Sequence, residues 1–144
     1  MTKCKDIRWE DGFPLREEAE DFSGRKRTFV ISCHEGPLGY TVHASEEGKE
    51  GLGYEFRAYS ETSPYSALGR VREKMRRGLA MRHIKGSPGN YDMLHSQLHG
   101  RISSDGEGGV ILIVDGLPLT TLNLAGILAT HEGFDFTLNI EDSH

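Results

Sequence analysis

The amino-acid sequence predicts an α+β fold, because segments with the two-residue period of strands occur beside segments with the helical period. Three observations carry this prediction: three short alternating segments over 28–59, an amphipathic helix within 63–85, and a carboxyl-terminal third typical of strand, helix and strand. We expect a three-stranded antiparallel meander, the amphipathic helix, a short helix and the strand-helix-strand segment, arranged as a single layer of sheet packed by helices.

The first 26 residues differ in character from the rest. Residues 1–26 are polar and acidic, and their few apolar residues follow no clean period. We therefore expect an irregular acidic arm over 1–26 and a single α+β domain over 27–142. Within that domain, apolar residues alternate with polar ones over 28–33, 40–44 and 54–59, as in half-buried strands.

A helix is expected from about residue 64. Ser63 suits the amino-terminal cap, and Pro64 suits the first helical position, where a missing N–H has no cost. The apolar residues of this segment fall on one stripe, namely Tyr65, Leu68, Val71, Met75 and Leu79. A break at 86–89 follows, and residues 90–99 are expected to form the short helix.

The carboxyl-terminal third begins with an apolar run over 109–114, which suits a strand covered on both faces. Thr120 is positioned to cap a following helix, with Leu119 and Leu124 as a hydrophobic staple. Residues 134–140 then alternate like a half-buried strand, so we expect Phe136 to be buried and Phe136→Ala to cost about 3–5 kcal/mol, with Asp135→Ala nearly silent. Whether this strand is a parallel neighbour of 109–114 or extends the meander stays open.

Charge is distributed unevenly along the chain. The formal net charge is −5, but residues 63–85 carry +6, so the remainder carries −11. This basic segment contains Arg70, Arg72, Lys74, Arg76, Arg77, Arg82 and Lys85 against Glu73 alone. On a helix, Arg70, Lys74 and Arg77 point away from the apolar stripe, while Arg72 and Arg76 flank it.

We expect a non-enzymatic interaction module whose basic helix face, 63–85, contacts an acidic protein partner or the chain's own acidic arm. The candidate binding residues are Arg70, Lys74, Arg77, Arg72, Arg76 and Lys85. Nucleic-acid binding through the same helix is the alternative, which the acidic composition and the sparse aromatic residues beside the helix disfavour. An enzyme near Asp115 is a third interpretation, which would require Glu132 or His131 close by.

We assign no catalytic residue, metal ligand or cofactor. On a helix, His95 and His99 would share a face and could bind one metal ion, with His83, His34 or Asp92 as a further ligand. The segment lacks the glutamate that a zinc protease places after its first histidine, so we expect both histidines to be exposed beside a loop.

The cysteines and the hydropathy bear on location. Cys4 and Cys33 are the only cysteines, and no apolar signal segment follows Met1, so we expect reduced thiols in the cytoplasm, with a Cys4–Cys33 disulfide as the less favoured alternative. No apolar run approaches the roughly 20 residues that a membrane-spanning helix requires.

Several short motifs resemble a family of small uncharacterised prokaryotic domains. They are DGLPLT, THEGFDF and FTLNI in the last third, a GY-containing hairpin, and the helix start SPYSALGR. The resemblance covers roughly residues 27–142 and implies no site residues, because the family has no assigned function. The order of elements over 27–82 is also similar in outline to antitoxin-type domains and to double-stranded RNA-binding folds.

Overall fold

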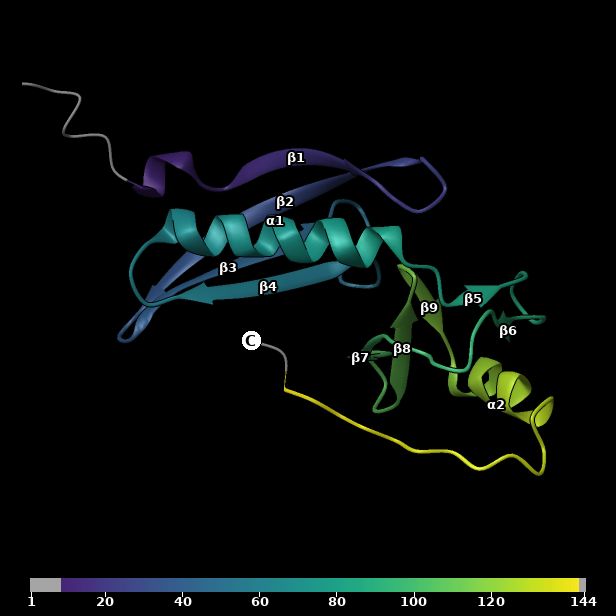
Figure 1. The fold of residues 1–144 in the computed structure, drawn as a ribbon. Helices are drawn as coiled ribbons and strands as arrows, with labels where there is room; N and C mark the ends of the chain where they lie inside the picture. Colours follow the sequence, from purple (N-terminus) through teal and green to yellow (C-terminus); the bar gives the residue numbers. More distant parts are fainter. Residues whose placement is uncertain (1–8, 143–144) are drawn as a thin grey trace, which may run out of the picture. The chain divides into compact units, whose positions relative to one another are not determined.

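The computed structural model describes residues 9–142 of the chain. These residues form two compact units. Unit 1 comprises residues 9–49 and Glu55–Ala80, and unit 2 comprises Glu50–Tyr54 and residues 81–142. The sequence predicted one domain over 27–142, whereas each unit has its own helix and β-sheet structure (Figure 1). Each unit also has buried apolar side chains of its own.

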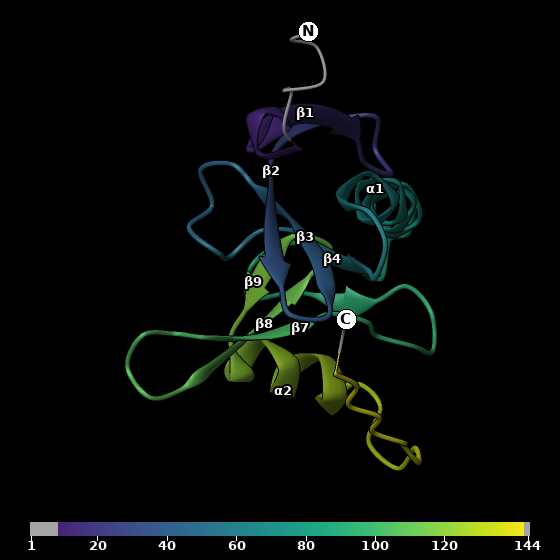
Figure 2. The ribbon, with the colours of Figure 1, turned by 90° about the vertical axis from the view of Figure 1, so that its left-hand side faces the viewer.

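Unit 1 is a four-stranded antiparallel sheet with one helix on one face. After a 3-10 turn at Trp9–Gly12, the strands are β1 (Leu15–Glu20), β2 (Lys26–Gly36), β3 (Gly39–Glu46) and β4 (Glu55–Ser60), in the spatial order β1-β2-β3-β4. Helix α1 (Pro64–Ala80) follows, and Figure 2 shows it nearly end-on against the sheet. The predicted antiparallel meander and the predicted helix are both confirmed.

Strand β1 corrects the prediction of an irregular arm. Its six residues pair with β2 in a continuous register from Leu15↔Ile31 to Glu20↔Lys26. The sequence gives little sign of this strand, because its inner positions hold Glu17 and only two apolar residues. Main-chain pairing along the long strand β2 provides the stabilisation that apolar burial would otherwise provide. The part of the predicted arm over 1–8 lies outside the described residues.

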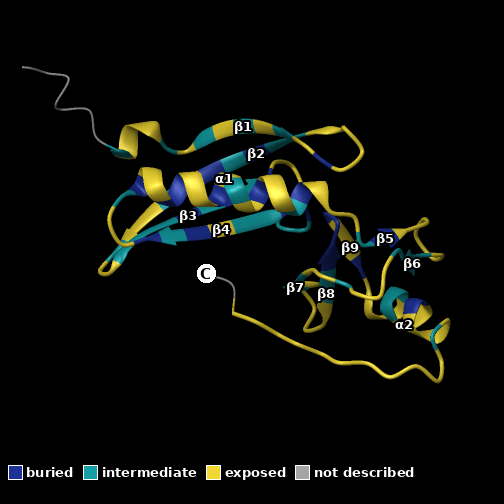
Figure 3. Ribbon diagram, in the orientation of Figure 1, coloured by how far each residue is buried: buried dark blue, intermediate teal, exposed yellow. Residues whose placement is uncertain are grey.

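The core of unit 1 lies between the sheet and α1. The buried apolar residues are Phe29, Ile31, Val42, Ala44 and Ala58 from the strands, and Ala67, Leu68, Val71, Met75 and Leu79 from the helix (Figure 3). Tyr65, predicted to be in the buried stripe, is instead 56% exposed. Pro64 takes the buried position, and the next residue is rotated by about 100° out of the stripe.

Unit 2 contains two small sheets and a short helix. Its elements are β5 (Ile84–Lys85), β6 (Asp92–Met93), β7 (Arg101–Ser104), β8 (Val110–Val114), β9 (Leu117–Leu119) and α2 (Thr121–Ala129). Strands β5 and β6 pair with each other, and β7, β8 and β9 form an antiparallel sheet in that order. A buried cluster of Ile84, Val114, Leu119 and Ile127 joins these elements.

Two predictions for this part of the chain are corrected. Residues 90–99 are not a helix, because Met93 pairs with Ile84 and the N–H of Leu94 donates to the carbonyl of His83. After β8, Asp115 and Gly116 form a two-residue hairpin turn into β9, each with a positive φ. An Asp-Gly pair between apolar runs is a strong hairpin signal; the sequence predicts a turn at this pair, but not the short strand β9 that follows it.

The final predicted strand is absent from the structure. Residues 134–140 pair with no strand of residues 9–142, and Phe134, Phe136, Leu138 and Ile140 are exposed at 74%, 85%, 75% and 68%. The prediction that Phe136 is buried is therefore wrong, and the expected cost of Phe136→Ala has no basis in burial within one chain. Alternation alone favours a strand, but a strand also needs a neighbour for its main-chain groups.

Thr120→Ala is expected to destabilise α2, because the predicted cap is present. The Thr120 side chain accepts from the N–H of Asn123 at 3.0 Å, and the Asn123 side chain accepts from the N–H of Thr120 at 3.0 Å. The loss should be about 0.5–2 kcal/mol and should appear as faster hydrogen exchange of the α2 amides. Thr120→Ser keeps the accepting oxygen, and an equal loss in that variant would contradict the capping role.

Among the described residues, no helix combines the length and the apolar character needed to cross a membrane.

Candidate interaction surface at the edge of strand β4

Two predicted binding residues of α1 contact the main chain of β4. Arg70 Nη1 donates to the carbonyl oxygen of Tyr59 at 2.6 Å, and Lys74 Nζ donates to the carbonyl oxygen of Arg57 at 2.6 Å. Positions 70 and 74 are one helical turn apart, and positions 57 and 59 are two apart on the strand. The helix therefore presents two cations to carbonyl groups on the same side of β4.

That side of β4 is the free edge of the sheet. The two-residue hairpin at 37–38 makes Gly36 and Gly39 a hydrogen-bonded pair, and bonded and non-bonded pairs then alternate along the antiparallel strands. The β4 residues whose main chain points to β3 are consequently Phe56, Ala58 and Ser60. The main-chain groups of Arg57 and Tyr59 point outward, where β4 is the terminal strand of the sheet.

The two cations thus partly satisfy an exposed sheet edge. An edge strand presents N–H and C=O groups that another chain can pair with, and lysine or arginine side chains are one way in which proteins limit such pairing. Here Arg70 and Lys74 cover the outward carbonyls of Tyr59 and Arg57. The helical periodicity placed these basic residues on the exposed side of the helix but did not predict that they bind the main chain of β4.

A hollow of about 400 Å³ lies between α1 and β4. It is lined by Ala58, Tyr59, Arg70, Glu73, Lys74 and Arg77. The Glu73 carboxylate pairs with Arg76 and, at 3.0 Å, with Arg77. Hydrogen bonds from Arg76 and Arg77 lower the pKa of Glu73, so the carboxylate is charged at neutral pH. We call this hollow, with the outward edge of β4, the β4 groove.

The remaining predicted binding residues lie elsewhere. Arg72 faces β1, where its guanidinium binds the Glu17 carboxylate through both Nε and Nη2, the shorter contact being 2.7 Å. One residue of the predicted acidic arm therefore does contact the basic helix. Lys85 belongs to β5, in unit 2. Within unit 1 the predicted residues therefore do not share one surface, and Arg70, Lys74 and Arg77 are the three that line the β4 groove.

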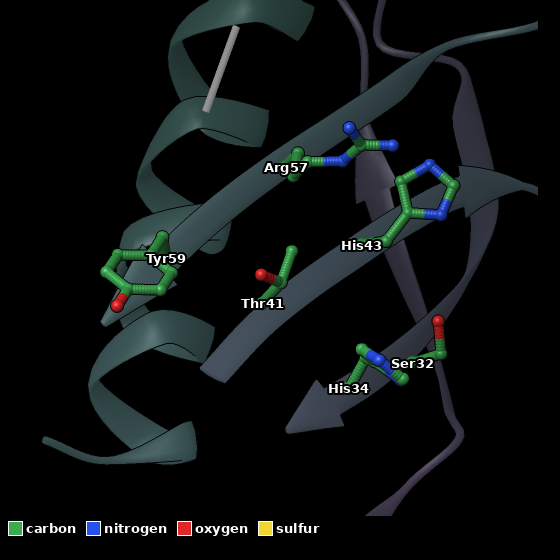
Figure 4. Close-up of a pocket in the computed structure, with 6 residues that line it drawn as sticks. All are labelled: Ser32, His34, Thr41, His43, Arg57 and Tyr59. Carbon is green, nitrogen blue, oxygen red and sulfur yellow. The ribbon is translucent and has the colours of Figure 1, made fainter. Parts of the chain in front are cut away.

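The opposite face of the sheet carries a second hollow, of about 410 Å³. Its lining residues are Ser32, His34, Thr41, His43, Arg57 and Tyr59, which Figure 4 shows on β2, β3 and β4. His43 Nε2 lies 2.9 Å from Glu55 Oε1, and the Tyr59 hydroxyl donates to the carbonyl of Leu38. His34 is also one of the metal-ligand candidates from the sequence, whereas none of the six is among the predicted binding residues. The alternation over 54–59 nevertheless places Arg57 and Tyr59 on one face of the strand.

Asp115 has a different environment from the one the enzyme interpretation required. Its buried carboxylate accepts from the N–H groups of His83 and Ile84, at 2.8 and 2.9 Å, and lies 2.8 Å from His83 Nδ1. Its contacts include neither Glu132 nor His131, whose Nδ1 lies near Thr130 Oγ1 and the carbonyl of Ile127. The carboxylate thereby links the main chain at the start of β5 to the turn between β8 and β9, and it orients the His83 ring.

The other candidates are dispersed. His95 and His99 lie on no helix, and the His99 ring packs at 5.4 Å from the His83 ring. Within residues 9–142, no three His, Cys, Asp or Glu side chains are grouped closely enough to hold a metal ion.

Burial, with Glu35 and Glu10, raises the pKa of the half-buried Cys33 thiol. The alternative of a Cys4–Cys33 disulfide involves Cys4, outside the described residues.

Comparison with known protein families divides the chain in the same way as the structure. Residues 12–80 match a domain of unknown function, DUF7686, and residues 83–144 match a second domain of unknown function, DUF7713. The predicted resemblance to uncharacterised domains is confirmed, although it falls on two domain types that meet near the boundary between units 1 and 2. No curated protein and no solved structure matches the chain significantly.

Proposed function

We propose that unit 1 is a protein-interaction module that binds an extended acidic segment of a partner protein in the β4 groove. The observation that carries the proposal is the outward-facing main chain of Arg57 and Tyr59, whose carbonyl oxygens accept hydrogen bonds from side-chain cations of α1. An extended peptide that adds to a sheet edge gains main-chain hydrogen bonds, while pockets for its alternate side chains provide specificity.

The two hollows of unit 1 fit this mode of binding. Tyr59 lines both of them, one beside α1 and one on the open face of the sheet. Successive side chains of an added strand point to opposite faces, so alternate residues of the partner would enter the two hollows. The residues that point toward α1 would meet Arg70, Lys74 and Arg77, which favours carboxylates at alternate positions of the partner.

Binding of the peptide would replace the hydrogen bonds between the α1 cations and the carbonyls of β4. The N–H groups of the added strand would donate to the carbonyls of Arg57 and Tyr59, which now accept from Lys74 and Arg70. The released cations would then pair with the carboxylates of the partner. Arg–carboxylate pairs can be bidentate and are among the stronger hydrogen bonds, so an acidic segment is favoured over a neutral one.

The test uses a fluorescent peptide of alternating glutamate and valine, with an alternating lysine and valine peptide as control. The full chain should bind the acidic peptide in an anisotropy titration, and Arg70→Glu with Lys74→Glu should weaken that binding at least about tenfold, or about 1.4 kcal/mol. The matched variant, Arg72→Glu with Arg76→Glu, makes the same charge change elsewhere on α1 and should have a much smaller effect.

A second measurement separates strand addition from simple charge attraction. Methylating alternate main-chain nitrogens of the acidic peptide removes donors without changing its charge, so one of the two methylation patterns should abolish binding. Equal binding of both methylated peptides would contradict strand addition. Equal weakening by the two double-charge variants, together with tighter binding of duplex RNA than of peptide, would favour the nucleic-acid alternative instead.

A further inference from the structure

Unit 2 leaves an unusual amount of apolar surface exposed. We define the tail as residues 134–142, in which Phe134, Phe136, Leu138 and Ile140 are all largely exposed. Their polar neighbours alternate with them, and Asn139 donates to Glu141 at 3.1 Å, as expected for residues on the same side of an extended chain. The tail has the side-chain pattern of a strand with one buried face.

A strand edge with a matching apolar face exists in the same unit. The two-residue turn at Asp115–Gly116 makes Val114 and Leu117 a hydrogen-bonded pair, and this fixes the alternation across the β7-β8-β9 sheet. It follows that β7 bonds to β8 through Arg101 and Ser103, whereas Ile102 directs its N–H and C=O to the free edge.

Ile102 also marks the apolar side of that edge. It is 54% exposed and directly opposite Leu112, which packs against the buried cluster of unit 2. The neighbouring Arg101 side chain points to the other face and donates to the carbonyls of Gly51 and Gly53. A strand added beside β7 would place its apolar side chains next to Ile102 and extend the cluster.

The other sheet edges of residues 9–142 are less suitable. Pro118 lies in the middle of β9 and has no N–H to donate, while β5 and β6 contain two residues each. The outward carbonyls of β4 are covered by Arg70 and Lys74. The inner face of β1 carries Glu17, which binds Arg72. An apolar tail therefore fits β7 best.

We infer that unit 2 associates with a second copy of this chain by exchange of tails, each tail adding as a strand to the β7 edge of the other copy. Donor and acceptor lie on the same chain, so a reciprocal exchange between two copies gives a closed, two-fold symmetric dimer. Within one chain, the tail leaves α2 through a turn in which Phe134 N–H donates to the His131 carbonyl, and it pairs with no strand of residues 9–142.

The area available is sufficient for a stable dimer. A phenylalanine side chain buries about 150–250 Å², so the four rings of two exchanged tails would bury about 600–1,000 Å². Leu138, Ile140, and the surfaces around Ile102 and Val110 that the tails cover add to this. The total reaches the range of specific interfaces, about 1,200–2,000 Å².

The test measures the oligomeric state of the full chain by sedimentation and light scattering. The unmodified chain should be a dimer at micromolar concentration, and Phe136→Asp with Leu138→Asp should make it monomeric. Thr137→Asp with Asn139→Asp adds the same charge to the polar side of the tail and should remain dimeric. Ile102→Asp, at the acceptor edge, should also give a monomer with an unchanged circular dichroism spectrum.

Mixing distinguishes exchange from other association. A chain with the two tail substitutions retains a native β7 edge, and an Ile102→Asp chain retains a native tail, so the two monomers together should form a heterodimer through one native contact. A monomeric unmodified chain, equal dissociation by the two tail variants, or failure of the mixture to associate would each overturn the inference.

Discussion

Replacing Arg27 with methionine is expected to lower the free energy of unfolding of unit 1 by about 3–5 kcal/mol. The guanidinium joins two buried carboxylates, with Nε 2.8 Å from Asp21 and Nη1 2.7 Å from Glu46. The three side chains are exposed at only 9%, 1% and 6%. Removing the cation would leave two buried carboxylates close together, and this repulsion is the source of the large effect.

Urea unfolding followed by tryptophan fluorescence provides the measurement. Trp9 is the only tryptophan in the sequence, and its ring packs against Phe13 and Tyr40, so it reports on unit 1. Arg16→Met is the matched control, because the Arg16–Glu47 pair is largely exposed and worth about 0–1 kcal/mol. Similar losses in the two variants would contradict a special role for the buried group.

The effect of Arg27→Met should also depend on pH. Burial by itself raises the pKa of Asp21, but hydrogen bonds from Ser23, Arg27 and the main-chain N–H of Arg25 outweigh it and lower the pKa to about 2. An aspartate in the unfolded chain has a pKa of about 3.9, so this carboxylate stabilises the fold above about pH 4, and the contribution is lost as the pH falls toward 2. The difference between the variant and the unmodified chain should therefore shrink on acidification.

Phe29→Ala is expected to cost unit 1 about 3–5 kcal/mol, the range for a fully buried aromatic side chain replaced by alanine. Phe29 has no exposed surface, and its ring lies 6.0 Å from the Phe56 ring beneath α1. Truncation would remove apolar contacts and leave a cavity that strands β1 and β3, each paired with β2, hinder from collapsing. The same fluorescence measurement in urea gives the loss.

Tyr65→Ala is the comparison for this prediction. The sequence placed Tyr65 on the buried stripe of the helix, but more than half of its surface is exposed, so the substitution should cost well under 1 kcal/mol. A loss for Tyr65→Ala as large as that for Phe29→Ala would restore the predicted stripe and contradict the helix orientation described above.

Sequence periodicity was sufficient to predict an element where the residues that stabilise it are close together in the sequence. Strands β2, β3 and β4 have alternating apolar residues separated by glycine-rich turns, and α1 has a proline at its first position and an apolar stripe. The cap of α2 needs only Thr120 and Asn123. In each case the residues that stabilise the element lie within the element or next to it.

The candidate site was predictable only in part. The charge imbalance over 63–85 identified Arg70, Lys74 and Arg77, but not their contacts with β4. Whether a carbonyl of β4 points outward depends on the register of two successive strand pairings, which begins at the 37–38 hairpin. No local pattern in the sequence predicts that alternation. The contact between Asp115 and His83 joins residues 32 positions apart, so residue spacing along the chain does not predict it either.

The sequence by itself determined the α+β class, the antiparallel meander, the basic helix and its cap residues, because these follow from local periodicity and turn chemistry. Only the tertiary structure decided that residues 15–20 form a strand and that residues 134–140 do not. Residues 134–140 alternate and residues 15–20 do not, yet β1 has the free edge of β2 to pair with, whereas the tail has no neighbouring strand within residues 9–142. Strand formation depends on a main-chain partner, and a partner distant in the sequence is a property of the folded chain.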